Sequence, residues 1–269
     1  MTVLADIIAA TRRKVRECSS QADIRELEQR AEEHFPRGFR RTLESASASG
    51  IAIIAELKKG SPSRGLIRSD FDPAALAREL EQAGATALSV LTDEEFFYGS
   101  LGNLRVASQE TRLPCLRKDF IVDEFQILEA RANLADAILL ITAALSQNEL
   151  TGLTARTRAL NLDVLCEVHD EEELGRALDA GCDLIGVNSR DLRTFNVDLT
   201  TALRLADSIP PGVVAVAESG IETGADICRL RSASYDAFLI GETLMRAEKP
   251  GEALQGLLAE AAASSVAGR

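Results

Sequence analysis

Charged side chains lie at the ends of several apolar segments of this chain. Glu56 and Lys58 end one segment, Lys118 ends another, and Glu167 and Glu218 interrupt two more. Because a lone buried charge is unfavourable, such charges must be paired or solvated in a cleft. Lysines and carboxylates that meet in one cleft shift each other's pKa, which prepares them for proton transfer. These residues predict acid–base chemistry, with a structural ion-pair network as the alternative for each residue taken singly.

The elements that must position these side chains are eight short, nearly continuous apolar runs. The runs lie at 51–57, 85–91, 113–118, 136–141, 163–168, 183–188, 213–219 and 236–241. Segments with helical spacing separate them, among them 73–82, 123–133, 170–180 and 223–231. Continuous apolar runs are typical of parallel strands covered on both faces. Eight alternating units predict an α/β fold, a closed (β/α)₈ TIM barrel with its site at the carboxyl ends of the strands.

Local signals agree with this alternation. Asp72 precedes Pro73 as an N-cap precedes the first helical residue, and Gly84 and Gly181 follow helical segments as C-terminal caps do. The main alternative is a doubly wound open sheet, which usually has a glycine-rich first turn. Neither G-x-G-x-x-G nor G-x-x-x-x-G-K-[ST] occurs in the chain, so the barrel is favoured.

The first fifty residues do not follow the strand–helix alternation. Helical apolar spacing runs over 3–31, and 38–45 is typical of a shorter helix. We therefore expect residues 1–50 to form an N-terminal helical extension that caps the barrel of residues 51–269, with one structural domain overall.

Composition excludes several classes of protein. The 269 residues are 46% hydrophobic and carry a formal charge of −12, which disfavours nucleic-acid and anionic-membrane partners. The longest uncharged apolar run, 137–148, is shorter than the roughly 20 residues of a membrane helix. Basic residues interrupt the first twenty positions, so a signal peptide is not expected. Five scattered cysteines and two distant histidines predict reduced thiols, no metal site and a cytoplasmic location.

Two glycine turns suggest an anion site. Ser219 and Gly220 follow the seventh predicted strand, and Gly241 follows the eighth. Barrels often bind phosphate at these two turns through backbone N–H groups. Each glycine taken alone is equally well explained as an ordinary turn residue.

Six motifs, in order along nearly the whole chain, closely resemble the indole-3-glycerol-phosphate synthase family of tryptophan biosynthesis. The motifs are IIAELKKGSPSRG (53–65), LRKDFIVDEFQI (116–127), CEVHDEEEL (166–174), GVNSRDLRTFNVD (186–198), AESGI (217–221) and FLIGETLM (238–245). The resemblance implies a carboxy-lyase that needs no cofactor. Its substrate would be 1-(2-carboxyphenylamino)-1-deoxyribulose 5-phosphate, which undergoes ring closure and loses carbon dioxide and water.

The resemblance also implies catalytic roles. Lys118 would be the acid near the sugar carbonyl, and Lys58, tuned by Glu56, the acid for dehydration, although which lysine serves which step stays open. Glu167 would be the base or stabilise a cation. The remaining catalytic residues implied are Asn188, which orients the substrate, and Ser219.

Further residues are implied to bind the substrate. Arg190 would hold its carboxylate, and Ser219, Gly220, Gly241 and Glu242 match the phosphate end, where some relatives have Ser in place of Glu242. A carboxylate there either leaves only its backbone N–H to serve or weakens the grip on phosphate. Two further implied binding residues are Ser61 and Glu218, and an apolar wall for the aryl ring would be built from Pro62, Phe97, Phe120, Leu139 and Leu192.

The expected partners are a small anionic substrate and, by resemblance, other tryptophan-pathway enzymes. Because the whole chain is acidic, we expect the site to be positive only locally, through Lys58, Lys59, Arg64, Arg117, Lys118 and Arg190. Three alternatives remain: another phosphate-binding barrel synthase or isomerase, a Schiff-base aldolase with Lys118 or Lys58 as nucleophile, and a non-catalytic binding protein on a barrel scaffold.

Overall fold

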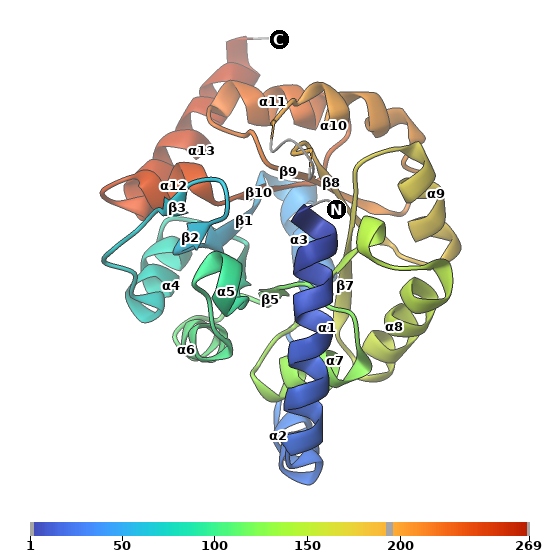
Figure 1. Ribbon diagram of the computed structural model, residues 1–269. Coiled ribbons are helices and arrows are strands. Elements are labelled where there is room, and N and C mark those ends of the chain that lie inside the picture. The colour runs from blue at the N-terminus through green and yellow to red at the C-terminus, as the bar shows by residue number, and fades with distance from the viewer. Residues whose placement is uncertain (1–2, 192–195, 268–269) are drawn as a thin grey trace.

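Eight parallel strands close into a barrel in the computed structural model, which describes residues 3–191 and 196–267 (Figure 1). In chain order the strands are β1 (Ala52–Leu57), β4 (Ala87–Leu91), β5 (Cys115–Lys118), β6 (Ala137–Ile141), β7 (Asp163–Val168), β8 (Leu184–Asn188), β9 (Val214–Glu218) and β10 (Ala237–Ile240). Each lies within one of the eight predicted segments, and β1 closes the barrel by pairing with both β4 and β10. The predicted (β/α)₈ barrel is confirmed.

Helices alternate with these strands and cover the outside of the barrel (Figure 1). They are α4 (Pro73–Gln82), α5 (Glu94–Phe97), α6 (Leu101–Gln109), α7 (Glu124–Ala132), α8 (Gln147–Ala159), α9 (Glu171–Asp179), α10 (Thr200–Leu205), α11 (Gly224–Ser232), α12 (Glu242–Arg246) and α13 (Pro250–Ala267), with 3₁₀ turns η1 (Thr142–Ala144) and η2 (Ala206–Ser208). Asp72 caps α4 as predicted, and Gly84 and Gly181 have positive φ angles. A short hairpin of β2 (Gly60–Ser61) and β3 (Gly65–Leu66) follows β1.

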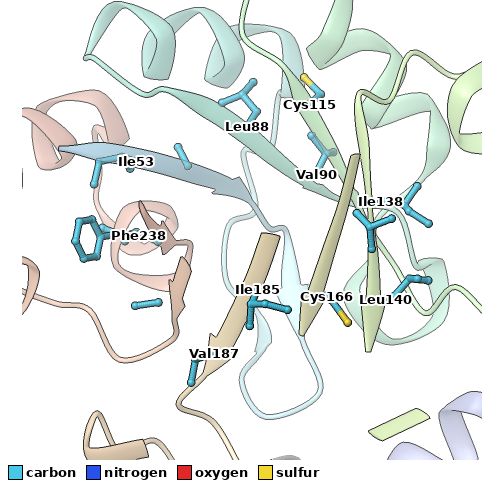
Figure 2. Packing of buried hydrophobic residues seen from close by; sticks show 14 of the residues in the cluster. Ile53, Leu88, Val90, Cys115, Ile138, Leu140, Cys166, Ile185, Val187 and Phe238 are labelled. Atoms are coloured by element: carbon cyan, nitrogen blue, oxygen red, sulfur yellow. The ribbon is translucent and has the colours of Figure 1, made fainter. Parts of the chain in front are cut away.

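Side chains alternate between two apolar layers along every strand. Ile54, Leu116 and Leu165 point into the barrel, whereas Ile53, Cys115 and Cys166 belong to a second cluster that includes residues of the surrounding helices. Figure 2 shows part of this second cluster. The alternation decides which residue at each strand end faces the barrel axis, because the inward series on a strand continues into its last residues.

The N-terminal extension consists of three helices, α1 (Val3–Gln21), α2 (Ile24–Glu33) and α3 (Phe39–Ser49). The expectation of one helical stretch over 3–31 is wrong, because the chain leaves the helix at Ala22 and Asp23 caps α2 with its side chain. Helix α3 is also longer than the predicted 38–45. Figure 1 shows α1 in front of the barrel opening, whereas Phe39 and Leu43 of α3 are fully buried within the inner apolar layer.

A buried carboxylate joins the extension to the amino-terminal ends of the strands. Asp136, at the start of β6, is fully buried and accepts hydrogen bonds from Arg37 Nε at 2.9 Å and from the backbone N–H of Cys115 at 2.6 Å. Burial alone would raise the pKa of Asp136, but hydrogen bonds from His34 and Arg37 and the charge of Arg37 outweigh it and lower that pKa. The ionised carboxylate therefore stabilises the attachment of α3.

We expect Asp136→Asn to lower the free energy of unfolding by about 3 kcal/mol, because it leaves Arg37 without its buried counter-ion. The Asp136 contribution is present above the pKa of the unfolded chain and is lost as the pH falls through the lowered folded value. Urea unfolding at several pH values measures it. The control is Asp183→Asn, an exposed partner of Arg158 at 3.4 Å, expected to cost less than about 1 kcal/mol. Equal effects of the two substitutions would contradict this account.

Candidate active site

A cavity of about 680 Å³ opens at the carboxyl ends of the strands. All predicted site residues that the structure describes line it: Glu56, Lys58, Ser61, Pro62, Phe97, Lys118, Phe120, Leu139, Glu167, Asn188, Arg190, Glu218, Ser219, Gly220, Gly241 and Glu242. The remaining prediction, Leu192, lies outside the described residues. The fold therefore brings residues from all eight strands, or from the segments that follow them, to one place.

The centre of the cavity is an ammonium group between two carboxylates. Lys118 Nζ lies 2.8 Å from Glu167 Oε2 and 2.9 Å from Glu218 Oε2. Strand register produces this meeting, since Lys118, Glu167 and Glu218 are the last or second-last residues of β5, β7 and β9 and all point inward. On β1, Lys58 Nζ lies 2.7 Å from Glu56 Oε1. Both lysines are therefore paired with carboxylates, an arrangement that an acid–base site and a structural ion-pair network share.

Burial and mutual charge drive the two central carboxylates apart in pKa. Desolvation opposes ionisation of both, but the charge of Lys118, followed by that of His169, lowers the pKa of Glu167 to about 2. Desolvation dominates at Glu218 and, with repulsion from Glu167 and Glu56, raises its pKa to about 7 despite Lys118. Glu218 Oε1 is buried without a hydrogen-bond partner, which also disfavours the charge. Near neutral pH, Glu167 is therefore ionised and Glu218 is partly protonated, and both contact the same ammonium.

The ammonium itself is held firmly in the charged form. Burial alone would lower the pKa of Lys118, but attraction to Glu167, Glu218 and Glu56 outweighs burial and raises the pKa. Protonation of Glu218 removes one of these negative charges and makes the ammonium a stronger acid. The protonation state of Glu218 therefore controls how readily Lys118 releases a proton.

Two glycines give the carboxylates room. A Cβ atom at Gly186 on β8 would collide with the carboxylate of Glu218, and one at Gly241 would collide with that of Glu56. Gly186 was missed by the sequence analysis. A glycine in the middle of a buried strand signals close approach by another group, so the signal was present. Gly241, predicted only as a phosphate-end residue, also has this packing role.

An apolar wall faces the charged cluster. The rings of Phe97 and Phe120 have centroids 6.2 Å apart and are tilted by 43°. Leu139 and Pro62 line the same cavity, as do Leu4 and Ile7 of α1, so α1 contributes apolar side chains over the mouth. The sequence analysis missed Leu4 and Ile7, because helical spacing identifies an apolar stripe but not the surface against which it packs.

His169 was considered in the sequence only as a metal ligand, yet it lies beside Glu167. Its Nδ1 is 3.0 Å from Glu173 Oε2 and its Nε2 is 3.5 Å from Glu167 Oε1. Burial disfavours the charged ring, but Glu173 and Glu167 outweigh burial and raise the pKa of His169. His169 therefore supplies a second positive neighbour to Glu167.

The turns after β9 and β10 form the end of the cavity expected to bind phosphate. Ser219 and Gly220 have consecutive positive φ angles of 67° and 77°, which is strained backbone for the serine. Three arginines lie at this end around the Glu242 carboxylate: Arg64, Arg190 and Arg246. The side chain of Glu242 is therefore in ion pairs.

Two of the six basic residues expected to make the site locally positive do not lie in it. Arg117 points away from the barrel axis and is buried against Asp119 and Glu129, and Lys59 is not among the lining residues. The described lining carries five basic and seven acidic side chains. Positive charge is in excess only around Glu242.

The described residues contain no group of three or more His, Cys, Asp or Glu side chains that could hold a metal ion. Within the same ranges, no helix is both long and apolar enough to cross a membrane.

The fold and this cavity define a (β/α)₈ barrel with a cluster of lysines and carboxylates in its cavity. The family model for indole-3-glycerol phosphate synthase matches residues 4–257. The chain is 57% identical over 257 residues to indole-3-glycerol phosphate synthase of Koribacter versatilis, covering 96% of this chain and 99% of the relative. It is 47% identical over 253 residues to that of Burkholderia ambifaria, covering 94% and 97%. The chain belongs to the indole-3-glycerol phosphate synthase family.

Solved structures at lower identity share the barrel alone. Thiamine phosphate pyrophosphorylase of Pyrococcus furiosus is 18% identical with a TM-score of 0.58, covering 77% of this chain and 93% of that one. A mandelate oxidase variant is 17% identical with a TM-score of 0.64, covering 91% and 86%. These similarities support the fold and carry no argument about the reaction.

The raised pKa of Glu218 predicts a pH-dependent stability. Because its folded pKa exceeds the unfolded value, its contribution is fully present below the unfolded pKa and is lost as the pH rises through about 7. From about pH 5 to about pH 8 the wild type loses this contribution, whereas the Glu218→Gln variant has no carboxyl group to lose it. We therefore expect the free energy of unfolding of Glu218→Gln, relative to the wild type, to be higher at the upper pH by on the order of 2 kcal/mol. Urea unfolding across this range measures it.

The control is Glu124→Gln, because the side chain of Glu124 is 65% exposed and its ion pair with Arg156 is long, at 3.7 Å. This variant should keep the wild-type pH dependence. If Glu218→Gln also keeps it, Glu218 is ionised throughout the range and the raised pKa is wrong.

Proposed function

We propose that this chain catalyses the ring closure of 1-(2-carboxyphenylamino)-1-deoxyribulose 5-phosphate to indole-3-glycerol phosphate, carbon dioxide and water. The observation that carries the proposal is the ammonium of Lys118 between Glu167 and Glu218, facing an apolar wall in one cavity. Family membership supports the same reaction, since relatives at 57% and 47% identity bear that name.

The substrate's three parts match three parts of the cavity. The aryl ring packs between Phe97, Phe120 and the other apolar side chains, and the phosphate lies at the turns of Gly220 and Gly241. Arg190 holds the aryl carboxylate, because a guanidinium offers two parallel donors to a planar carboxylate. The sugar carbonyl then lies near the charged residues of the strand ends, where proton transfer is needed.

The first chemical step joins the aryl carbon that bears the carboxylate to the sugar carbonyl carbon. Lys118 donates a proton to the carbonyl oxygen, which becomes a hydroxyl, and Glu167 stabilises the positive charge that the ring system acquires. Loss of carbon dioxide returns the bonding electrons to the ring. Asn188 supports this geometry by accepting the backbone N–H of Arg190 at 3.0 Å.

The second chemical step removes water. Lys58, positioned by Glu56 at 2.7 Å, protonates the hydroxyl, which leaves as water. Glu167 accepts the proton of the neighbouring methylene carbon, and the indole ring becomes aromatic. Ser61 and Ser219 border the cavity on the hairpin and after β9, where they contact the sugar and phosphate ends. Every step uses side chains of the chain itself and needs no organic cofactor.

The assay supplies the aryl-amino sugar phosphate and follows indole fluorescence. The chain has no Trp and two Tyr, so its own emission is a small background. We expect indole-3-glycerol phosphate and an equal amount of carbon dioxide. Consumption of the substrate without an indole product would instead favour another sugar-phosphate barrel enzyme.

We expect Lys118→Ala to lower kcat by about 100-fold or more, the usual size of a general-acid contribution. Substrate affinity should change less, because the aryl and phosphate ends are untouched. The matched control is Lys59→Ala, which removes a lysine next to Lys58 that does not line the cavity and should retain its turnover. Near-normal turnover in a folded Lys118→Ala protein would remove Lys118 from the mechanism.

We also expect activity to persist in excess EDTA, because the proposed acids are lysines and the described residues hold no cluster suited to a metal. Turnover before and after chelation and dialysis measures this. Activity that disappears in EDTA and returns with one divalent cation would contradict the proposed chemistry.

The same proposal places the chain in the cytoplasm, acting on a small anionic substrate without nucleic acid or membrane. Its net charge of −12 and the lack of a membrane-length helix in the described residues support this. Other enzymes of tryptophan biosynthesis are the proposed protein partners, because they supply the substrate and consume the product.

A further inference from the structure

Three guanidinium groups surround one carboxylate at the edge of the cavity. Glu242 Oε1 lies 3.0 Å from Arg64 Nε and 3.6 Å from Arg246 Nη1, and Glu242 Oε2 lies 3.6 Å from Arg190 Nη2. The groups come from separate parts of the fold: Arg64 from the β2–β3 hairpin, Arg190 from the loop after β8, and Glu242 and Arg246 from α12. Long-range folding therefore assembles the cluster.

The charges of this cluster are net positive, whereas those at the centre of the cavity are not. Lys58 has Glu56, and Lys118 has two carboxylates. A single carboxylate, that of Glu242, pairs with both Arg64 and Arg246, and Glu222, another acidic residue of the lining, is exposed. Excess positive charge thus remains at the end of the cavity that contains Gly220 and Gly241.

The side chains of the cluster differ in their exposure to solvent. The side chain of Glu242 is 19% exposed, whereas those of Arg64 and Arg246 are 58% and 65% exposed. A smaller cavity of about 220 Å³ lies between them and is lined by Arg64, Leu66, Ile67, Glu242 and Arg246. An anion that enters the main cavity can therefore reach both arginines without unfolding any element.

We propose that Arg64 and Arg246 bind the phosphate group of the substrate, and that Glu242 is the internal counter-ion that the phosphate displaces. The identification of the anion as a substrate phosphate rests on the proposed function. A phosphate carries more charge than a carboxylate and offers three terminal oxygens, so it is the stronger partner for two guanidinium groups. Without phosphate, Glu242 keeps the arginines gathered and limits their mutual repulsion.

Although Glu242 lies in the proposed phosphate site, its side chain opposes phosphate binding. Its carboxylate competes with phosphate for the arginines, so it weakens binding of substrate and product alike. The Glu242→Gln variant retains the side-chain shape and removes the charge. It should bind phosphate more tightly than the wild type, whereas Arg64→Ala and Arg246→Ala should bind it more weakly.

The experiment measures the binding of inorganic phosphate to the full-length protein by calorimetry, at low and at moderate ionic strength. We expect Arg64→Ala and Arg246→Ala each to raise the Kd by roughly five- to tenfold, and Glu242→Gln to lower it by about threefold. Added salt should shrink each difference, because the groups are partly exposed. The control is Arg204→Ala, an arginine 57% exposed and 3.6 Å from Glu171, which should leave the Kd unchanged.

A double substitution separates competition from a structural role. If Glu242 competes with phosphate, Arg64→Ala should cost more affinity in the Glu242→Gln background than in the wild type. Weaker phosphate binding by folded Glu242→Gln protein would overturn the counter-ion role, and an unchanged Kd in both arginine variants would overturn the phosphate site.

Parallel measurement of indole production separates this inference from the proposed function. If the phosphate affinities change as expected but no indole forms from the aryl-amino sugar phosphate, the phosphate site stands and the assigned reaction is wrong. If indole forms at the wild-type KM in both arginine variants, the reaction stands and the phosphate site is wrong.

Discussion

The arrangement of the cavity follows from the free-energy cost of burying the Lys118 ammonium group inside the barrel. Lys118 lies at the closed side of the cavity, where water cannot solvate it fully, so carboxylates must compensate its charge. Two of them, Glu167 and Glu218, do so within 2.9 Å. One ammonium cannot satisfy two buried carboxylates equally, and the pKa values of the two diverge to about 2 and about 7. Neutralising Lys118 thus leaves one carboxylate that is ionised and one that titrates near neutral pH.

The barrel makes this compensation possible because the last inward-facing residues of its parallel strands lie close together around the barrel axis. Glu56, Lys118, Glu167 and Glu218 continue inward series that deeper in the barrel are apolar, such as Ile54, Leu116 and Leu165. Clearance is equally necessary: Gly186 and Gly241 lack the Cβ atoms that would strike Glu218 and Glu56. At the other end of the strands, Asp136 binds Arg37 and the backbone of β5, and α3 packs Phe39 and Leu43 against the inner apolar layer.

Much of this arrangement could be predicted from the sequence, because strand periodicity is local. The eight apolar runs contained all eight strands, and strand alternation puts Lys118 on the same face as Leu116. The break between α1 and α2 was missed, because the Asp23 cap competes with an otherwise continuous helical pattern. Arg117 was assigned to the mouth although its neighbour Lys118 faces inward, and strict alternation would have directed Arg117 to Asp119 and Glu129.

Contacts between distant segments were beyond sequence reasoning. The positions of Leu4 and Ile7 over the cavity, and the gathering of three arginines at Glu242, depend on how loops and α1 fold back across the barrel. Nothing local in SPSRG or IGETLM relates Arg64 to Arg246. The pKa of Glu218 likewise depends on its distance from Glu167, which belongs to a strand two positions away in the barrel.

The central claim is that Lys118 acts as a charged acid and not as a neutral nucleophile. Reduction with borohydride during turnover of the aryl-amino sugar phosphate, followed by mass analysis of the intact protein and its peptides, tests this most directly. An ammonium held by Glu167 and Glu218 forms no imine, so the account predicts an unmodified protein mass and an unmodified Lys118 peptide. A reduced substrate adduct on Lys118, formed only when substrate and borohydride are both present, would contradict it.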